Sequence, residues 1–405
     1  MKRYFLGMAA GYSTGEVWRH TFAMGRKSDC RALKKYLRGR YGGESTEDTR
    51  VVLCKNGRSA LCLALMAYFE PGDAVIVNGF TCYAVYEAVK SAGLTPIWAD
   101  VSREDLNFDL SLLQVTRAGD GSGGNPKNVL RSKNFWGGKE PAGPARKIAG
   151  IIIQNSLGNP VDVKQVEAFA RKHELTIIED LAHSAGVKYA DGREAGTVGA
   201  AAVFSFGKDK AIDTVSGGAV VLRHPCKREI KAPSKLPKLS DHLRARFYPF
   251  FGTVCRGLAS VHLGGALMRG LVKIHWVEKS ADNRLDLERK ISKFEARLAL
   301  KQFKKFKKSG EAPLRKFCLV QNRGEVLREL QKAGYYFGGF WYERPVSPER
   351  YYKKVHFPEE NCPNSVFVAK HIINLPTYYS KADLAPALKI IEKYLLRDTR
   401  GGREK

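Results

Sequence analysis

The chain has 405 residues, of which 44% are hydrophobic, and a formal net charge of +27 at pH 7. This length and composition exclude a disordered chain and predict one large domain with a smaller one. The large positive charge indicates attraction to an anionic partner: nucleic acid, a phospholipid surface or a phosphorylated substrate. The sequence contains no helix-turn-helix, zinc-finger or RNP signature, which argues against nucleic acid.

Eight cysteines are scattered along the chain without a C-x-x-C pair, and several of them lie in apolar runs. This distribution is typical of reduced structural thiols and argues against disulfides and a zinc site. The first eleven residues include two positive charges, but their apolar segment is short and Glu16 and Arg19 follow soon after. A cleaved signal peptide is therefore not expected, and we expect a cytoplasmic protein without a metal centre.

The first βα unit places a glycine turn at the start of an apolar helix. Val51–Cys54 reads as a strand, and the turn 56–59 (Asn-Gly-Arg-Ser) leads into a helical run over 60–65. Free N–H groups and the positive end of the helix dipole at such a turn suit a phosphate. An ordinary turn between a strand and a helix has the same spacing, and by spacing alone it is the better interpretation.

Further βα repeats follow, with strands predicted at 74–77 and 96–100 and a helix from Phe80 to Gly93. Residues 117–147 are rich in glycine, proline and basic residues and have no periodicity. They predict a surface insertion, which is either a loop that projects into solvent or a loop that lies over a ligand-binding cleft.

The stretch from Leu175 to Val221 carries the candidate chemistry. A buried parallel strand is predicted to end in Glu179 and Asp180, and the next strand ends in Ser205, five residues before Lys210. A carboxylate, a hydroxyl and a lysine past neighbouring strand ends are the groups that pyridoxal phosphate needs for its ring nitrogen, its phosphate and a Schiff base. Solvated polar residues at the edge of a βαβ sheet would give the same pattern.

A basic segment separates this region from the C-terminal part. Residues 223–256 contain nine Lys or Arg residues and two acids, and residues 247–276 are apolar but interrupted by cations. A transmembrane helix needs about 20 predominantly apolar residues, so this segment is too broken to cross a bilayer. One or two amphipathic helices on an anionic membrane and a helical hairpin packed on the protein or across a dimer interface both fit the pattern.

From residue 286 onward a long helix and a small αβ unit are predicted. We therefore expect a large domain over residues 1–222 that includes the insertion 117–147. A basic amphipathic insertion over residues 223–285 and a helix with a small C-terminal domain over residues 286–405 complete the expected division.

The motifs Glu179-Asp180-Leu181-Ala182-His183, Ser205-Phe206-x-x-x-Lys210 and Gly217-Gly218 resemble the E-D-x-A-H, S-F-x-x-x-K and Gly-Gly motifs of the DegT/DnrJ/EryC1/StrS sugar aminotransferases. The resemblance implies the α/β fold of type I aminotransferases that depend on pyridoxal phosphate (PLP), with a large, mostly parallel sheet and a smaller C-terminal α+β domain. It also implies a homodimer that transfers an amino group from an amino acid, usually glutamate, to a nucleotide-linked keto-sugar for polysaccharide or glycoconjugate synthesis.

The same resemblance assigns roles to the candidate residues. Lys210 would bind the cofactor covalently and act as base and acid, and Asp180 would keep the pyridine nitrogen protonated. His183 matches the position beside the ring's 3-hydroxyl. The phosphate would be held by Ser205 and the turn, and Cys82 stands where the family commonly stacks an aromatic residue on the ring. The turn residues are Gly57, Arg58 and Ser59, of which Arg58 would add a charged contact.

Several positions leave alternatives open. Lys208 is a competing amine, and the S-F-x-x-x-K spacing selects Lys210. Family dehydratases replace this lysine with histidine, so Lys210 argues against dehydration. In the family, the Asn of an N-x-R motif contacts the cofactor phosphate of the partner subunit. This chain has Glu288-Arg289-Lys290 at that place, so we do not expect this contact here. The rival hypothesis from another class is a basic, membrane-associated or regulatory protein that keeps the fold without catalysis.

Overall fold

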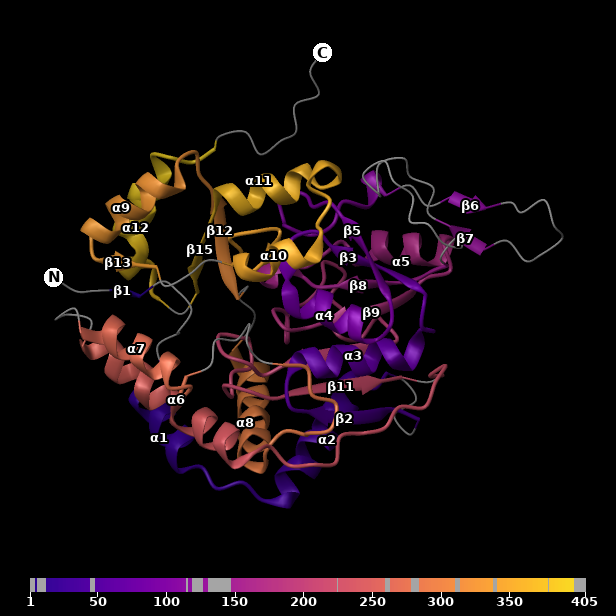
Figure 1. Ribbon diagram of the computed structural model, residues 1–405, viewed down its shortest axis with the longest axis horizontal. Coiled ribbons are helices and arrows are strands. Elements are labelled where there is room, and N and C mark those ends of the chain that lie inside the picture. Colours follow the sequence, from indigo (N-terminus) through magenta and orange to yellow (C-terminus); the bar gives the residue numbers. More distant parts are fainter. Residues whose placement is uncertain are drawn as a thin grey trace, which may run out of the picture.

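The computed structural model describes residues 4–5, 12–43, 48–113, 116–118, 127–129, 147–223, 225–258, 263–277, 284–309, 314–337, 341–377 and 379–396. A seven-stranded sheet lies at its centre, in the order β2-β11-β10-β9-β8-β3-β5 (Figure 1). Its strands are β2 (Arg50–Cys54), β3 (Ala74–Asn78), β5 (Thr95–Ala99), β8 (Ile148–Ile153), β9 (Thr176–Asp180), β10 (Ala201–Ser205) and β11 (Gly218–Leu222). Neighbouring strands are parallel, except that β11 is antiparallel to both β10 and β2. This mostly parallel sheet confirms the predicted α/β fold class.

Helices cover both faces of the sheet because its strands are apolar on both sides. Alternate residues of β10 enter different cores: Ala202 and Phe204 pack on one face, and Ala201 and Val203 pack on the other. The first core is closed by α2 (Lys27–Tyr41), α5 (Val163–Lys172) and α8 (Lys293–Ser309), and the second by α3 (Gly57–Tyr68) and α4 (Tyr83–Ser91). With both faces covered, polar side chains can meet only at the carboxyl ends of the strands.

The C-terminal part has a small core of its own. In it, β12 (Arg315–Leu319) pairs antiparallel with β15 (Ile372–Pro376), and two helices pack beside them. The other elements of this part are α9 (Arg323–Lys332), β13 (Tyr335–Tyr336), β14 (Val346–Ser347), α10 (Glu349–Val355), α11 (Pro363–His371) and α12 (Lys381–Glu392). Two pairings connect it to the rest of the chain, because β13 pairs with β1 (Tyr4–Phe5) and β14 pairs with β4 (Thr81–Cys82).

Three helices form a separate group beside α8: α1 (Thr14–Phe22), α6 (Leu239–Gly257) and α7 (Leu263–Lys273). Figure 1 shows them together below the N-terminus, with α6 between α1 and α7. Tyr248 and Leu271 are buried against Phe294 of α8. Helices are therefore present in the segment 247–276, where the sequence predicts them, but the first begins at Leu239. Within the described residues, no helix is both long and apolar enough to cross a bilayer.

The remaining described elements are short. Of the predicted insertion 117–147, the structure describes parts of a small antiparallel hairpin and Lys147, and the other residues lie outside the described part of the chain. The hairpin strands are β6 (Thr116–Ala118) and β7 (Lys127–Val129), and the 3₁₀ helices are η1 (Leu110–Leu112), η2 (Ser156–Gly158) and η5 (Glu359–Asn361).

A buried carboxylate fixes the loop that leads from β9 to β10. Glu179 of β9 accepts hydrogen bonds from the N–H groups of Gly196 (2.7 Å), Val198 (2.8 Å) and Gly199 (2.7 Å), and from the hydroxyl of Tyr189 (2.8 Å). Its side chain has no contact with water, so these donors replace the whole hydration shell of the carboxylate. Glu179 therefore has a structural role, although the sequence pairs it with Asp180 at the strand end.

We expect Glu179→Gln to lower the free energy of unfolding by about 2 kcal/mol or more, because the new amide group faces backbone donors in a buried site. Denaturant titration measures this loss. Glu167→Gln is the matched control, because Glu167 pairs with Arg193 at the surface and such a pair contributes about 1 kcal/mol or less. Equal losses for the two variants would contradict the role given to Glu179.

Candidate active site

Asp180 lies at the carboxyl end of β9, where successive side chains point to opposite faces, so that it faces away from Glu179. Its carboxylate is buried and accepts a hydrogen bond from the N–H of Ala182 (3.0 Å). Burial raises the pKa of Asp180, and the Ala182 N–H and the positive charge of Lys210 oppose this rise. The carboxylate can therefore form a strong pair with a cationic group at this strand end.

Lys210 lies beside this carboxylate, in the loop after β10. Its Nζ is 3.1 Å from Nε2 of His183 and 4.6 Å from the ring centroid of Trp341. Burial lowers the pKa of Lys210, and the charge of Arg315 lowers it further. Interactions with Cys82, Asp180 and Asp209 oppose this shift. A buried amine with a lowered pKa has a larger uncharged, nucleophilic fraction near neutral pH. The other candidate, Lys208, lies elsewhere, with its Nζ 4.1 Å from the ring centroid of Tyr248 on α6.

His183 connects this strand end to the C-terminal part of the chain. Its Nδ1 accepts a hydrogen bond from the N–H of Leu157 (3.2 Å), and its Nε2 lies 3.3 Å from the hydroxyl of Tyr342. The ring stacks on Trp341 with centroids 4.7 Å apart. Burial lowers the pKa of His183 well below its usual value, and the charges of Lys210 and Arg315 lower it further. The imidazole is therefore neutral, and since Nδ1 accepts, its proton is on Nε2, facing Lys210.

Two glycines let the start of α3 lie close to the strands, Gly57 to the end of β10 and Gly218 to the start of β11. A Cβ on Gly57 would lie 2.5 Å from Cβ of Ser205, and a Cβ on Gly218 would lie 2.6 Å from the backbone carbonyl of Asn56. Side chains at either position would separate the helix from the strand. Glycine at these positions brings the positive end of the α3 dipole beside the Ser205 hydroxyl, which is the arrangement that suits a phosphate.

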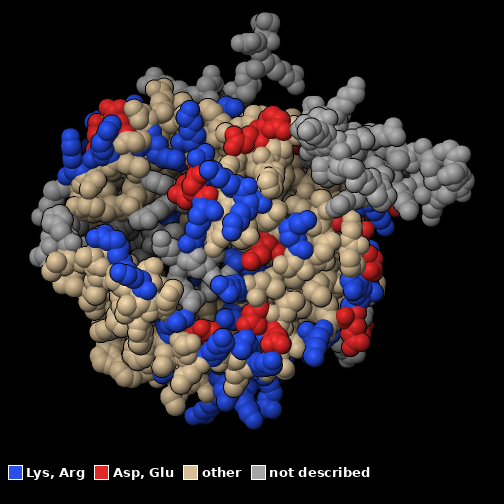
Figure 2. Space-filling view, in the orientation of Figure 1, with Lys and Arg blue, Asp and Glu red and all other residues tan. Residues whose placement is uncertain are grey.

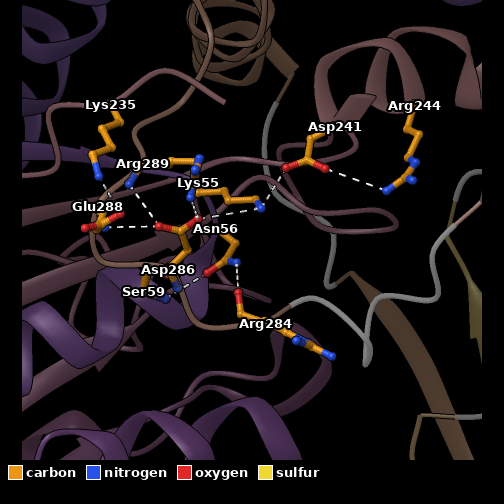
Figure 3. A network of polar contacts seen from close by, with 10 residues as sticks. All are labelled: Lys55, Asn56, Ser59, Lys235, Asp241, Arg244, Arg284, Asp286, Glu288 and Arg289. Atoms are coloured by element: carbon orange, nitrogen blue, oxygen red, sulfur yellow. Dashed lines mark hydrogen bonds and ion pairs between the residues drawn. The ribbon is translucent and has the colours of Figure 1, made fainter. Parts of the chain in front are cut away.

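The turn before α3 is also bound by a later segment of the chain, as Figure 3 shows. Asn56 accepts the N–H of Ser59 (2.8 Å) and donates to the carbonyl of Arg284 (3.0 Å), and the hydroxyl of Ser59 accepts the N–H of Asp286 (2.9 Å). Lys55 pairs with Asp241 (2.8 Å) and lies 3.8 Å from Asp286. Residues 284–290 therefore lie beside the predicted phosphate site.

Two predicted cofactor residues have additional partners. The guanidinium of Arg58 forms an ion pair with Glu87 of α4, and its Nε is buried without a hydrogen-bond partner in the described structure. Arg58 thus lies at the helix start, but with its charge directed to Glu87. Cys82 lies at the end of β4, close enough to interact electrostatically with Lys210 and Tyr342. The structure thus brings Cys82 together with Lys210.

Four residues of this site were missed by sequence reasoning: Gln154, Arg315, Trp341 and Tyr342. The guanidinium of Arg315 lies 5.1 Å from the ring centroid of Trp341 and binds Asn374 (3.3 Å), which in turn donates to the carbonyl of Trp341 (2.6 Å). Gln154 donates to Thr81 (2.8 Å), while its Oε1 is buried without a partner among the described residues. No local motif marks these positions, because folding brings Arg315, Trp341 and Tyr342 to Lys210 or His183 from distant parts of the chain, and brings Gln154 to Thr81.

Asp213 holds the loop that carries Lys210. Its carboxylate accepts hydrogen bonds from the N–H of Asp209 (2.9 Å), the N–H of Val215 (2.8 Å) and the hydroxyl of Tyr12 (2.9 Å). Asp209 and Val215 have φ values of 62° and 71°, which are unfavourable for non-glycine residues and especially for a β-branched one. These hydrogen bonds therefore stabilise a strained backbone on both sides of Lys210.

Gln302 of α8 binds the same residue from the other side. Its Oε1 accepts the N–H of Asp213 (2.8 Å), and its Nε2 donates to the carbonyl of Asp213 (2.6 Å). Burial raises the pKa of Asp213 to about 7, and the charge of Asp209 adds to this effect. The protonation state of Asp213 therefore changes near neutral pH.

Asp213 should make stability fall as pH rises. The folded state keeps the proton up to about pH 7, whereas the unfolded chain loses it near 3.8, so folded protein binds more protons between these values. Between about pH 5 and about pH 8, we expect the free energy of unfolding of the native protein to fall by a few kcal/mol relative to that of Asp213→Asn. Unfolding at a series of pH values measures the difference. Asp191 pairs with Arg193 (2.7 Å), which lowers the pKa of its carboxyl, so Asp191→Asn should leave the native pH profile between about pH 5 and about pH 8 unchanged. A native profile in Asp213→Asn would refute the assignment.

The sequence comparisons match the region that contains this site. The model of the DegT/DnrJ/EryC1/StrS aminotransferase family matches residues 43–121 and 139–242. A pleiotropic regulatory protein from Geobacillus stearothermophilus is 27% identical over 197 residues, which are 47% of this chain and 45% of the relative. GDP-perosamine synthase from Escherichia coli O157:H7 is 32% identical over 167 residues, which are 41% of this chain and 38% of the relative. The match thus spans less than half the length of these curated relatives.

The fold comparison extends over nearly the whole chain. The crystal structure of a DegT DnrJ EryC1 StrS aminotransferase from Brucella abortus covers 94% of this chain and 93% of its own, with a TM-score of 0.58 and 20% identity. At this identity the likeness shows the fold, and the family assignment depends on the match to the sequence motifs around Asp180 and Lys210. Residues 43–121 and 139–242 of this chain therefore match the DegT/DnrJ/EryC1/StrS aminotransferase family, whose motifs the sequence carries around Asp180 and Lys210.

Proposed function

We propose that this protein is a PLP-dependent aminotransferase that moves an amino group from an amino acid, glutamate, to the keto group of a nucleotide-linked sugar for surface polysaccharide or glycoconjugate synthesis. The observation that carries the proposal is the buried Lys210 amine, 3.1 Å from Nε2 of His183 and within the field of Asp180. The name of one relative, GDP-perosamine synthase, indicates the nucleotide-sugar class. The net charge of +27 is compatible with a diphosphate-bearing substrate.

The residues present fit the cofactor that the family implies. Glycine at positions 57 and 218 lets the N–H groups at the start of α3 lie beside the Ser205 hydroxyl, and these groups together can hold a phosphate. A pyridinium nitrogen would find the buried carboxylate of Asp180, and the unpartnered Oε1 of Gln154 offers a further acceptor at the same sheet edge. We infer that Gly57, Arg58, Ser59, Cys82, Asp180, His183, Ser205 and Lys210 form the cofactor site.

When bound, PLP supplies an electron-withdrawing ring that stabilises negative charge at the carbon bearing the donor amine. Asp180 holds a proton at the ring nitrogen, where its desolvated carboxylate interacts strongly with a cation. Lys210 acts as nucleophile because burial lowers the pKa of its amine and so increases the uncharged fraction. For the same reason its Nζ can take up a proton and release it again. His183 presents its Nε2 proton toward Lys210 and so fixes the direction of that amine. Trp341 and Tyr342 limit access of water to it.

We further propose that the chain acts as a homodimer in the cytoplasm and attaches peripherally to the inner face of the membrane. Support for the dimer comes from family membership. Support for a membrane partner comes from the basic segment 223–256 and from the amphipathic helices α6 and α7. We retain the division into residues 1–222, 223–285 and 286–405 as a proposal. The separate apolar cluster of the C-terminal part supports a small domain from β12 onward, whereas α8 packs against the large sheet and α1 packs with α6.

Lys210→Ala should abolish the visible absorption band and the borohydride-fixed PLP adduct, whereas Lys208→Ala should keep both. The structural reason is that only Lys210 places its amine beside Asp180 and His183, while Lys208 lies over Tyr248. Mass spectrometry of the reduced, digested protein locates the adduct. An adduct that persists in Lys210→Ala would refute the assignment.

Purified protein incubated with PLP, glutamate and a panel of nucleotide-linked keto-sugars should produce an amino-sugar detectable by mass. Because the carboxylate of Asp180 sustains the cofactor chemistry, we expect the rate to fall about 100-fold or more in Asp180→Asn. Transamination of ordinary 2-keto acids without any product from a keto-sugar would overturn the substrate class and leave the cofactor assignment intact. A colourless protein that forms no adduct would favour the rival hypothesis of a regulatory protein without turnover.

A further inference from the structure

We infer that α1, α6 and α7 form a docking face for an anionic phospholipid bilayer. The inference rests on the peripheral membrane attachment proposed above and does not depend on the transfer reaction. The docking face is defined by exposed apolar side chains on α1, on the C-terminal half of α6, on α7 and on the residues that directly follow α1 and α7. These side chains are Trp18, Phe22, Met24, Phe250, Leu263, Leu267, Ile274 and Trp276.

The docking face concentrates exposed apolar surface. Its eight side chains are between 37% and 72% exposed, and they are eight of the twelve large hydrophobic residues exposed in the described part of the chain. Trp18 and Phe22 stack with centroids 4.9 Å apart, and Leu263 and Leu267 are one helical turn apart. Single exposed apolar residues are common on soluble proteins, whereas a grouped set marks an interaction site.

The exposed side chains are not explained by loosely attached helices, because the other sides of these helices are already packed. Arg246 of α6 donates to the carbonyls of Thr21 (3.0 Å) and Ala23 (2.8 Å), so it caps the end of α1 with a cation. Tyr248 and Leu271 fill the core that α6 and α7 share with α8. The group thus combines a buried side with an exposed apolar side, as an interfacial helix requires.

The charge beside the docking face selects an anionic surface. No acidic residue occurs in α7, and the only acid in α6, Asp241, lies in its first turn, where it pairs with Lys55 (2.8 Å). Arg269 and Lys273 are exposed on α7. Figure 2 shows this part of the visible face as mostly uncharged, with Lys and Arg beside it. Such cations attract anionic lipid headgroups, whereas the same face of a second copy would bring like charges together.

A groove between α1 and α8 adds a place for apolar chains next to cations. It has a volume of about 580 Å³ and is lined by Trp18, Phe22 and Met24 together with Arg297 and Lys301. Aromatic rings with adjacent long cationic side chains are typical of residues at a membrane–water interface. A bilayer therefore accounts for the aromatic, aliphatic and cationic parts of the face at once.

The test is co-sedimentation of the full chain, loaded with PLP, with vesicles of phosphatidylcholine alone or of phosphatidylcholine mixed with phosphatidylglycerol. We expect binding to the mixed vesicles only, and a loss of binding in high salt because the charge interaction is screened. Leu263→Glu with Leu267→Glu should weaken binding about tenfold or more, through lost apolar contact and added repulsion. Arg269→Gln with Lys273→Gln should weaken it and reduce its salt dependence.

The matched control is Leu112→Glu with Leu388→Glu, which changes two equally exposed leucines outside the docking face and should leave binding unchanged. The thermal unfolding and the PLP absorbance of every variant show that the fold and the cofactor site remain. Binding that persists in the Leu263 and Leu267 variant would overturn the inference, as would equal binding to neutral vesicles. If the native chain binds no vesicles and a variant of the docking face changes the oligomeric state, the face is an interface between copies of this chain, and the inference is wrong. Loss of the transfer reaction with vesicle binding intact would count against the proposed function alone.

Discussion

The site depends on keeping an amine and a carboxylate out of water in the same place. Burial disfavours the charged forms of both Lys210 and Asp180, and the attraction between them offsets part of this cost. Such an arrangement persists only where the surrounding fold prevents either group from reaching solvent. The covered parallel sheet holds the carboxylate at a strand end, and the ring of Trp341 from the C-terminal part lies against the amine. Both the large sheet and the C-terminal part are thus needed to keep the amine and the carboxylate out of water.

The sequence predicted the residues whose position follows from a strand end or a turn. Asp180 and Ser205 lie at the ends of β9 and β10 because a parallel sheet delivers strand ends to one edge, and Gly57 opens α3 as expected. The fold class follows from the same alternation of strands and helices. Glu179 shows the limit of the argument, because adjacent residues of one strand face opposite sides and the pattern alone does not say which acid faces the site.

What the sequence could not provide are contacts between distant segments. The ion pair of Arg58 with Glu87 joins two helices, and the contact of His183 with Tyr342 joins positions 159 residues apart. Asp213 is adjacent to the lysine motif, yet its role depends on Tyr12 and Gln302 from far along the chain. Segment 247–276 left two interpretations open, helices on a membrane and a packed helical hairpin. Amphipathic periodicity predicts only that each helix has an apolar and a polar side. The identity of the partner on each side is set by tertiary packing and by the solvent.

The position of β11 in the sheet has a consequence for the order in which the protein forms. Strand β2 precedes every other strand of the large sheet in the chain, and within the described residues it pairs only with β11, the last of these strands. During synthesis β2 therefore emerges long before its partner and has no neighbour to pair with until the ribosome has passed residue 222. The packing of α3 against Ser205 also has to wait for β11, because the backbone of Gly218 lies against Asn56. A nascent chain interrupted after Lys210 would thus contain every residue proposed for the cofactor site but not β11, which lies against the turn before α3. It would also expose an unpaired strand edge to chaperones or to aggregation.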